Sequence, residues 1–306
     1  MSLRLSTAPH IRSPRSTQRL MLNVIIALLP SCAAGIYFYG IKALIVMLVS
    51  TFSAVAAEFV WQKLAHKPVR IGDFSAAVTG LLLALIVTPN TPWWVIMIGS
   101  FFAIIIVKQL FGGIGDNFLN PAMAARAVLL ASWPAHLTNH ALLTDAVSSA
   151  TPLAAAKGTY SYLDLFLGNV PGAIGETCKA AILLGLIFLI VTKTVTWRIP
   201  VFTLASTFIF AWILGLEPVF AILSGGIMFA AAFMANDYTT SPMSFRAQAV
   251  YGAGIGLLTV IIRKFGAYPE GVTYAVLFMN ILTPLLDRYI PHKVYGHTEK
   301  KEVKKA

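Results

Sequence analysis

A string rich in hydroxyl groups near the middle of the chain is the clearest candidate for chemistry. It runs from Asp145 to Leu153 as Asp-Ala-Val-Ser-Ser-Ala-Thr-Pro-Leu. Proline disfavours the helical conformation in the residue before it, so Thr151 is expected in an extended segment that another protein could grip. Ser, Thr, Asp and Pro also gather wherever a chain turns, and composition alone indicates an ordinary loop here.

Two further groups of polar side chains border apolar runs of the sequence. They are Asp116, Asn117 and Asn120 before Pro121, and Asn236, Asp237, Thr239, Thr240 and Ser241. Acidic and amide groups at such depths in a membrane protein are costly unless they are satisfied, which makes them candidate site residues. They could line a cation path with oxygen ligands or hold a ligand by hydrogen bonds. Helix N-capping, which favours Asp and Asn, is the alternative for about half of them.

The sequence offers no pattern typical of a metal site. None of its six histidines pairs with a carboxylate at ligand spacing. Two cysteines are too few for the four-cysteine shell of an iron–sulfur cluster or a structural zinc ion. Glu58 is the most isolated acid within an apolar run. It could relay a proton, but a place beside Lys63 near the end of its helix is the simpler expectation.

Composition places these residues in an integral membrane protein. Of the 306 residues, 58% are hydrophobic and 11% charged, whereas soluble domains carry about 25% charged residues. A bilayer core requires about 20 apolar residues per helix, and fewer where a helix is broken. We therefore expect an all-α fold with about ten transmembrane helices, near 20–39, 42–62, 74–89, 92–111, 118–133, 177–192, 200–215, 218–235, 246–263 and 270–287.

The distribution of lysine and arginine predicts the orientation of these helices. With the N-terminus in the cytoplasm, 18 of the 23 basic residues, Arg126 among them, fall inside and 5 outside, as the positive-inside rule requires. Both termini are then cytoplasmic, and the loop with Thr151 lies outside. The asymmetry accounts for the net charge of +11, so no nucleic-acid partner is expected.

Two places in the first half of the chain recur in the second. Residues 117–121, Asn-Phe-Leu-Asn-Pro, resemble residues 280–284, Asn-Ile-Leu-Thr-Pro, and Thr79-Gly80 matches Ser224-Gly225-Gly226. Five helices per half would make the second copy inverted, as in transporters that bind a ligand between short or broken helices. Prolines such as Pro121 and Pro284 fall where such helices could end. Chance similarity between common membrane-helix motifs is the alternative explanation.

The expected organisation has five parts. They are a basic cytoplasmic segment (1–19), a first five-helix repeat (20–133), an external loop (134–176), a second five-helix repeat (177–290) and a basic cytoplasmic tail (291–306).

The string ending at Thr151 resembles the flavinylation motif Asp-x-x-Ser-Gly/Ser-Ala-Thr, in which a flavin transferase moves FMN from FAD onto the threonine hydroxyl. Ser149 stands where glycine is commonest. Residues 111–122, Phe-Gly-Gly-Ile-Gly-Asp-Asn-Phe-Leu-Asn-Pro-Ala, and residues 236–243, Asn-Asp-Tyr-Thr-Thr-Ser-Pro-Met, extend the likeness. Over essentially its full length the chain resembles the RnfD/NqrB family. RnfD is a membrane component of the Rnf electron-transport complex, and NqrB belongs to the sodium-pumping NADH:quinone reductase.

The resemblance implies a membrane subunit of an ion-translocating oxidoreductase in a bacterial or archaeal cytoplasmic membrane. Electrons would pass between ferredoxin and NAD, partly through FMN joined covalently to Thr151, and Na⁺ or H⁺ would be moved. The motif contributes Asp145, Ser148, Ser149 and Ala150. Other membrane and peripheral subunits would be partners, with a flavin transferase for maturation, and this chain alone would hold no complete active site.

Family members can also hold a second, non-covalent flavin, either riboflavin or FMN. Its candidate residues are those of the possible ion path, Asp116, Asn117, Asn120, Asn236, Asp237 and Thr240. A channel or carrier for small solutes, built as an inverted repeat with no redox role, is the rival function. A plain carrier would have no use for the string from Asp145 to Thr151.

Overall fold

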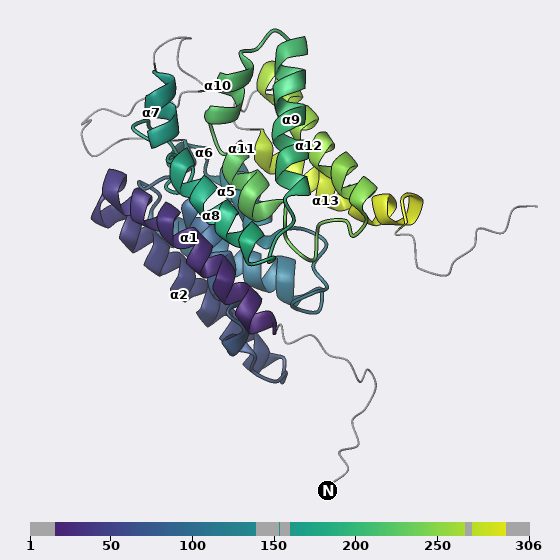
Figure 1. Ribbon diagram of the computed structural model, residues 1–306. Helices are drawn as coiled ribbons and strands as arrows, with labels where there is room; N and C mark the ends of the chain where they lie inside the picture. The colour runs from purple at the N-terminus through teal and green to yellow at the C-terminus, as the bar shows by residue number, and fades with distance from the viewer. Residues whose placement is uncertain (1–15, 139–152, 154–159, 267–270, 292–306) are drawn as a thin grey trace, which may run out of the picture.

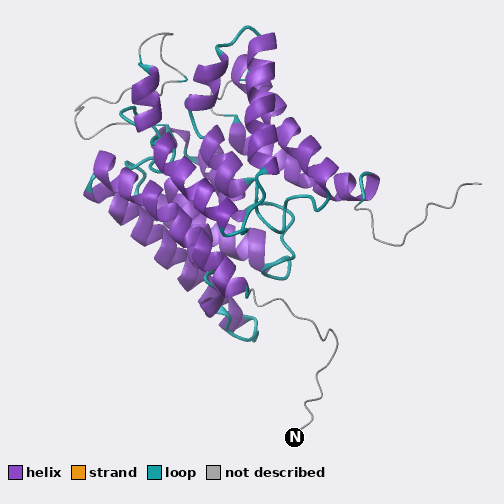
Figure 2. Ribbon diagram, in the orientation of Figure 1, coloured by secondary structure: helices purple, strands orange, loops and turns teal. Residues whose placement is uncertain are grey.

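The chain folds into a bundle of helices. The computed structural model describes residues 16–138, 153, 160–266 and 271–291, and within these ranges it contains helices and no strand (Figures 1 and 2). The expectation of an all-α protein is confirmed for this part of the chain. The flavinylation string from Asp145 to Thr151 lies outside the described residues.

Each of the ten predicted apolar runs contains a helix. The first half holds α1 (Thr17–Tyr39), α2 (Ile41–Leu64), η1 (Ile71–Asp73), α3 (Ser75–Leu85), α4 (Trp93–Phe101) continued by η2 (Phe102–Gln109), and α5 (Pro121–Ser132). The intervening loop forms α6 (Pro134–Leu137) and α7 (Tyr162–Leu167). The second half holds α8 (Lys179–Val191), α9 (Arg198–Ile213), α10 (Pro218–Leu223), α11 (Ile227–Phe229) continued by η3 (Ala230–Met234), α12 (Phe245–Phe265) and α13 (Val272–Tyr289).

Length and apolar composition single out three of the described helices, α1, α2 and α12, as able to cross a membrane alone. The other apolar helices are shorter or interrupted. Pro284, expected at a helix end, lies inside α13, which continues to Tyr289. Proline is tolerated inside membrane helices because neighbouring groups satisfy the backbone that it frees.

The short helix α3 ends inside the protein, and a segment of the intervening loop completes its hydrogen bonding. Gly175 N donates to Leu85 O at 2.7 Å, and Ile174 N donates to Val87 O at 3.1 Å. Carbonyl groups at a buried helix end need such partners. The loop before α8 is therefore inserted between the helices.

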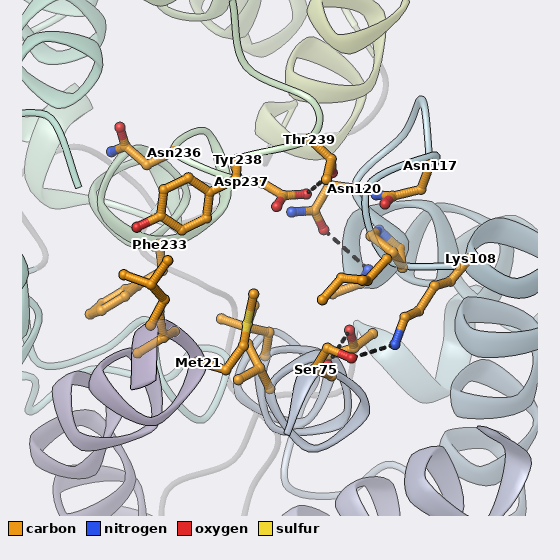
Figure 3. A pocket seen from close by; sticks show the side chains of 18 of the residues that line it. Met21, Ser75, Lys108, Asn117, Asn120, Phe233, Asn236, Asp237, Tyr238 and Thr239 are labelled. Carbon is orange, nitrogen blue, oxygen red and sulfur yellow. Dashed lines mark hydrogen bonds between the residues drawn. The ribbon is translucent and has the colours of Figure 1, made fainter. Parts of the chain in front are cut away.

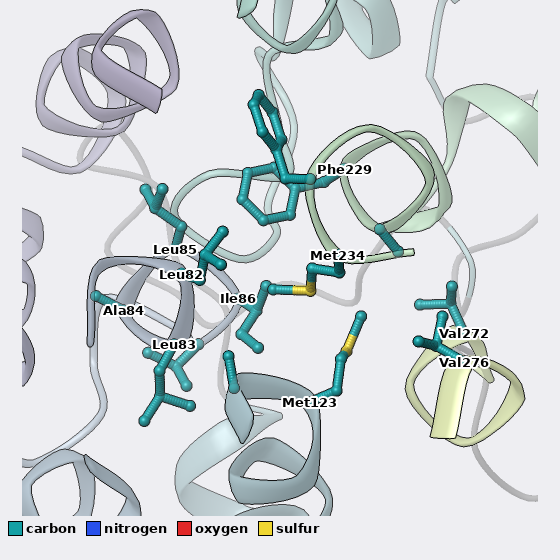
Figure 4. Packing of buried hydrophobic residues seen from close by; sticks show 14 of the residues in the cluster. Leu82, Leu83, Ala84, Leu85, Ile86, Met123, Phe229, Met234, Val272 and Val276 are labelled. Carbon is teal, nitrogen blue, oxygen red and sulfur yellow. The ribbon is translucent and has the colours of Figure 1, made fainter. Parts of the chain in front are cut away.

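The two halves pack in corresponding ways. α2 lies against α3 and α4, and α9 lies against α10 and α12. Across the halves, α1 packs along α8, and α5 meets α13 (Figure 1). The short helices converge at the centre, where Leu83, Met123, Phe229, Met234 and Val276 pack together (Figure 4).

Close approach of α1 and α8 depends on Gly185. A Cβ atom at this position would lie 2.2 Å from the Ala27 carbonyl oxygen and 2.7 Å from the Phe233 ring. Gly185→Ala is therefore expected to force the helices apart and to cost about 1–3 kcal/mol, as overpacking typically does. Thermal unfolding of the detergent-solubilised protein measures the loss. Gly72→Ala is the control, because a Cβ there meets nothing within 4 Å, and equal melting temperatures for the two variants would contradict the prediction.

Candidate functional site

A cavity of about 380 Å³ lies at the end of the bundle where α1 begins (Figure 3). Both polar loops singled out from the sequence open into it, one before α5 and one after η3. Apolar walls come from α1, α3 and η3, through Met21, Val78 and Phe233. Ligand pockets usually combine such apolar walls with a few placed polar groups and measure about 300–1,000 Å³.

Asn120 joins the two halves of the chain at this cavity. Its Oδ1 accepts hydrogen bonds from Ala122 N at 3.1 Å and Met123 N at 3.2 Å, which caps α5. Its Nδ2 donates to Met234 O at 3.3 Å, at the end of η3. The capping alternative is therefore correct for Asn120, and the same side chain also bridges the halves. Asn117 donates within its own loop, to Leu119 O at 3.1 Å.

Asn236 and Asp237 form the opposite wall. Asn236 Nδ2 donates to Ala231 O at 3.0 Å and so closes the last turn of η3. Asp237 accepts from the hydroxyls of Thr239 at 3.2 Å and Thr240 at 3.4 Å. Within the described part of the chain it has no ion-pair partner. Burial raises the pKa of Asp237 above its ordinary value, although these hydrogen bonds act in the opposite direction.

Four of the six residues proposed for an ion path or a second flavin line this cavity, namely Asn117, Asn120, Asn236 and Asp237. The other two do not. Asp116 is exposed, and Thr240 is buried behind the wall, where its carbonyl oxygen accepts from Thr283 Oγ1 at 2.8 Å.

Lys108 also lines the cavity, and no pattern in the sequence pointed to it. Its Nζ lies 2.9 Å and 3.1 Å from the two Glu58 carboxylate oxygens and 2.6 Å from Ser75 Oγ. Gln109 Nε2 donates to the same carboxylate at 2.6 Å. The expectation that Glu58 lies beside Lys63 is wrong, because Lys63 instead sits over the Phe59 ring at 4.7 Å.

Two π-helical segments lead to the cavity. In η2, Leu110 N donates to Ile105 O at 3.0 Å, and at the end of η3, Ala235 N donates to Ala230 O at 2.8 Å. Bonds five residues apart are rare, and such wide turns are frequent at functional sites. Lys108 lies within the first segment, and Asn236 follows directly after the second.

A second buried ion pair lies in the other part of the bundle. Arg126 NH1 of α5 is 2.9 Å from Glu176 Oε1, just before α8, and both side chains are almost fully buried. The positive-inside count placed Arg126 among the cytoplasmic charges. That placement is not what the structure shows, because a buried partner holds the guanidinium inside the protein.

The model of the NQR2, RnfD, RnfE family matches residues 4–296. The chain belongs to this family. The RnfD-type component of the Na⁺-translocating ferredoxin:NAD⁺ oxidoreductase complex of Acetobacterium woodii is 48% identical, over 100% of this chain and 99% of the relative. Its counterpart in the proton-translocating complex of Clostridium ljungdahlii is 39% identical over 95% and 96%. The counterpart in the ion-translocating oxidoreductase complex of Cronobacter sakazakii is 35% identical over 97% and 100%.

The resemblance seen in the sequence is thus confirmed at the level of the NQR2, RnfD, RnfE family. The attachment of FMN to Thr151 stays a prediction. Leu153, two residues after Thr151, is described and packs against the break between α10 and α11, near Gly225. In this family member, therefore, the chain just after the flavinylation string meets the bundle far from the cavity near the start of α1.

Proposed function

We propose that this chain is the RnfD component of an ion-translocating ferredoxin:NAD⁺ oxidoreductase complex. The observation that carries the proposal is its full-length similarity to three proteins of that kind, up to 48% identical. The chain would conduct electrons within the complex and help to couple their transfer to Na⁺ or H⁺ movement. A redox-free carrier is not favoured, because none of these relatives is named as one.

FMN would be joined to Thr151 by a phosphoester bond made by a flavin transferase. The support is the string Asp145-Ala-Val-Ser-Ser-Ala-Thr151, which keeps the spacing of the motif with Ser149 in the variable position. In such enzymes the flavin ring performs the chemistry, and the protein positions it. Thr151 is accordingly a tether rather than a reacting group.

The proposed topology has ten transmembrane spans in two inverted five-helix repeats, with both termini in the cytoplasm and Thr151 outside. The matching packing of α2 and α9 within their halves supports the repeat. Lysine and arginine remain strongly biased toward one side when Arg126 is left out of the count. The remaining surfaces would meet lipid and the other subunits of the complex.

The cavity near the start of α1 is the proposed site of the second, non-covalent flavin. A flat ring system fits apolar walls such as Val78 and Phe233, and its nitrogen and oxygen atoms require the donors and acceptors that Asn117, Asn120 and Asn236 supply. A bare cation path would not need such apolar walls. The alternative role in ion conduction rests on Asp237.

Filling the cavity should remove this second flavin. Val78→Phe places a ring in the space between α1 and α3, so acid-extractable flavin in the purified complex is expected to fall severalfold. Covalent flavin in the same sample should stay constant and serves as the internal standard. Val128→Phe, at an exposed position outside the cavity, is the matched control. Unchanged extractable flavin in Val78→Phe would move the second flavin elsewhere.

Ferredoxin-dependent NAD⁺ reduction coupled to ion uptake tests the function as a whole. Membrane vesicles with the intact complex should show both activities, and vesicles that lack only this chain should lose both. Solute flux that persists without ferredoxin and is lost with the chain would instead establish the carrier.

A further inference from the structure

The eighth apolar run is interrupted at residues 224–226, and main-chain oxygens there face into the protein. α10 ends at Leu223 and α11 begins at Ile227, with Gly225 at φ +65° between them. In transporters, the unwound carbonyl groups of a broken helix coordinate Na⁺ or take part in proton transfer. The groups that partner these carbonyls therefore indicate what the break is built to bind.

One partner is the ammonium group of Lys179. Its Nζ donates to the Gly225 carbonyl oxygen at 2.8 Å and also to the carbonyl oxygen of Glu176. The side chain is 2% exposed. Because Arg126 pairs with the Glu176 carboxylate, the ammonium group mainly satisfies neutral carbonyl oxygens. It therefore has the charge and the surroundings of a bound monovalent cation.

A small cavity of about 20 Å³ adjoins the ammonium group, lined by Glu176, Thr177, Lys179 and Gly225 among others. About 10–15 Å³ is enough to hold one water molecule. The Thr177 hydroxyl, beside Tyr39, is 3% exposed and makes no hydrogen bond of ordinary geometry. A buried oxygen without a partner beside two carbonyl groups completes a ligand set for a small cation.

The glycine after Gly225 keeps this arrangement compact. A Cβ atom on Gly226 would lie 2.3 Å from a Glu176 carboxylate oxygen and 2.4 Å from its Cδ. Glu176 is therefore pressed against the broken helix, and its main-chain oxygen is held within reach of Lys179.

We propose that the break at residues 224–226 is a binding site for Na⁺, which Lys179 keeps closed by placing its own ammonium group on the ligand oxygens. The ligands would be the carbonyl oxygens of Gly225 and Glu176 with the Thr177 hydroxyl. Neutral oxygens and a single carboxylate already paired with arginine suit a monovalent ion. A space of one water molecule favours Na⁺ over the larger K⁺.

This proposal rests on the proposed function of ion translocation, but its test does not use electron transfer. Thermal unfolding of the purified, detergent-solubilised complex is followed in NaCl, KCl and choline chloride at equal ionic strength. Lys179→Gln removes the built-in cation and should make the melting temperature rise with Na⁺ alone. At a Na⁺ concentration ten times the dissociation constant, the ratio of folded to unfolded protein rises about elevenfold.

Two matched variants make the result specific. Lys179→Arg keeps a cation at the site and should show no preference among the three salts. Lys42→Gln makes the same change at an exposed position and should behave as the wild type does. Equilibrium binding of radioactive Na⁺ should show one more ion per complex for Lys179→Gln than for wild type.

Equal unfolding of Lys179→Gln in the three salts would overturn the proposal, as would the same Na⁺ dependence in Lys42→Gln. If Lys179→Gln assembles poorly, preparation in Na⁺ but not in K⁺ should restore its yield, and a yield that is equal in both salts overturns the proposal too. Ferredoxin-dependent NAD⁺ reduction by the wild-type complex is decided separately, so failure of the cation site leaves the proposed function standing.

Discussion

Thr151→Ala is expected to remove all covalent flavin while leaving the protein in the membrane. The transferred phosphoryl group needs a hydroxyl acceptor, and alanine has none. The string belongs to the predicted loop between the two halves, so its loss should not disturb the packing of α1, α5 or α8. In-gel flavin fluorescence after denaturation, together with intact mass, measures the modification when a flavin transferase is co-expressed. The wild-type chain should fluoresce and be heavier by FMN less water.

Two variants separate the role of the hydroxyl from that of the loop. Thr151→Ser keeps the acceptor and should retain part of the modification. Thr144→Ala removes a threonine hydroxyl from the same loop just before the motif, and its fluorescence should equal that of the wild type. Covalent flavin in Thr151→Ala would show that another residue is modified. A dark, unmodified wild type would favour the carrier and make solute flux the next assay.

Lys108→Met is expected to cause a larger loss of stability than a typical single substitution. It leaves the Glu58 carboxylate buried without a cation, although Gln62 and Gln109 still donate to it. Removing one partner of a buried ion pair typically costs about 3–5 kcal/mol. The melting temperature of the solubilised protein should fall accordingly, and the cavity lined by Lys108 should bind its ligand less well.

The double variant Glu58→Gln/Lys108→Met distinguishes a lost pair from lost packing. Because no charge is then left buried, most of the stability should return. Lys63→Met is the control at an exposed lysine of the same region and should change stability by only a few tenths of a kcal/mol, as surface substitutions usually do. If the double variant is less stable than Lys108→Met, the two charges are not mutually stabilising.

The sequence predicted the helices well because lipid imposes a local rule that each apolar run must obey. All ten predicted runs contain helices, with boundaries that differ by a few residues at most, apart from the shortened α3, the late start of α5 at Pro121 and the break after Leu223. Ser224-Gly225-Gly226 already indicated where that interruption lies. The matching places of the two polar loops in the two halves likewise agree with their meeting in one cavity.

The ion pairs could not be predicted in this way, because their partners are far apart in the chain. Lys108 is 50 residues from Glu58, and Glu176 is 50 residues from Arg126. The pairing of Glu58 with Lys63 was chosen for nearness in sequence. Residues five apart do not share a helix face, whereas residues three or four apart do. Counting Arg126 as cytoplasmic failed for a related reason, since the positive-inside rule applies to residues near the ends of helices.

The wide turns of η2 and η3 have a consequence for how this cavity could have arisen. A hydrogen bond that spans five residues instead of four accommodates one additional residue in the turn. Deleting one residue from either segment would restore ordinary helical phase and swing everything beyond it by about 100°. Lys108 would then turn away from Glu58, and Asn236 would leave the cavity wall. Each half of the molecule thus owes its contribution to the cavity to the equivalent of a single inserted amino acid.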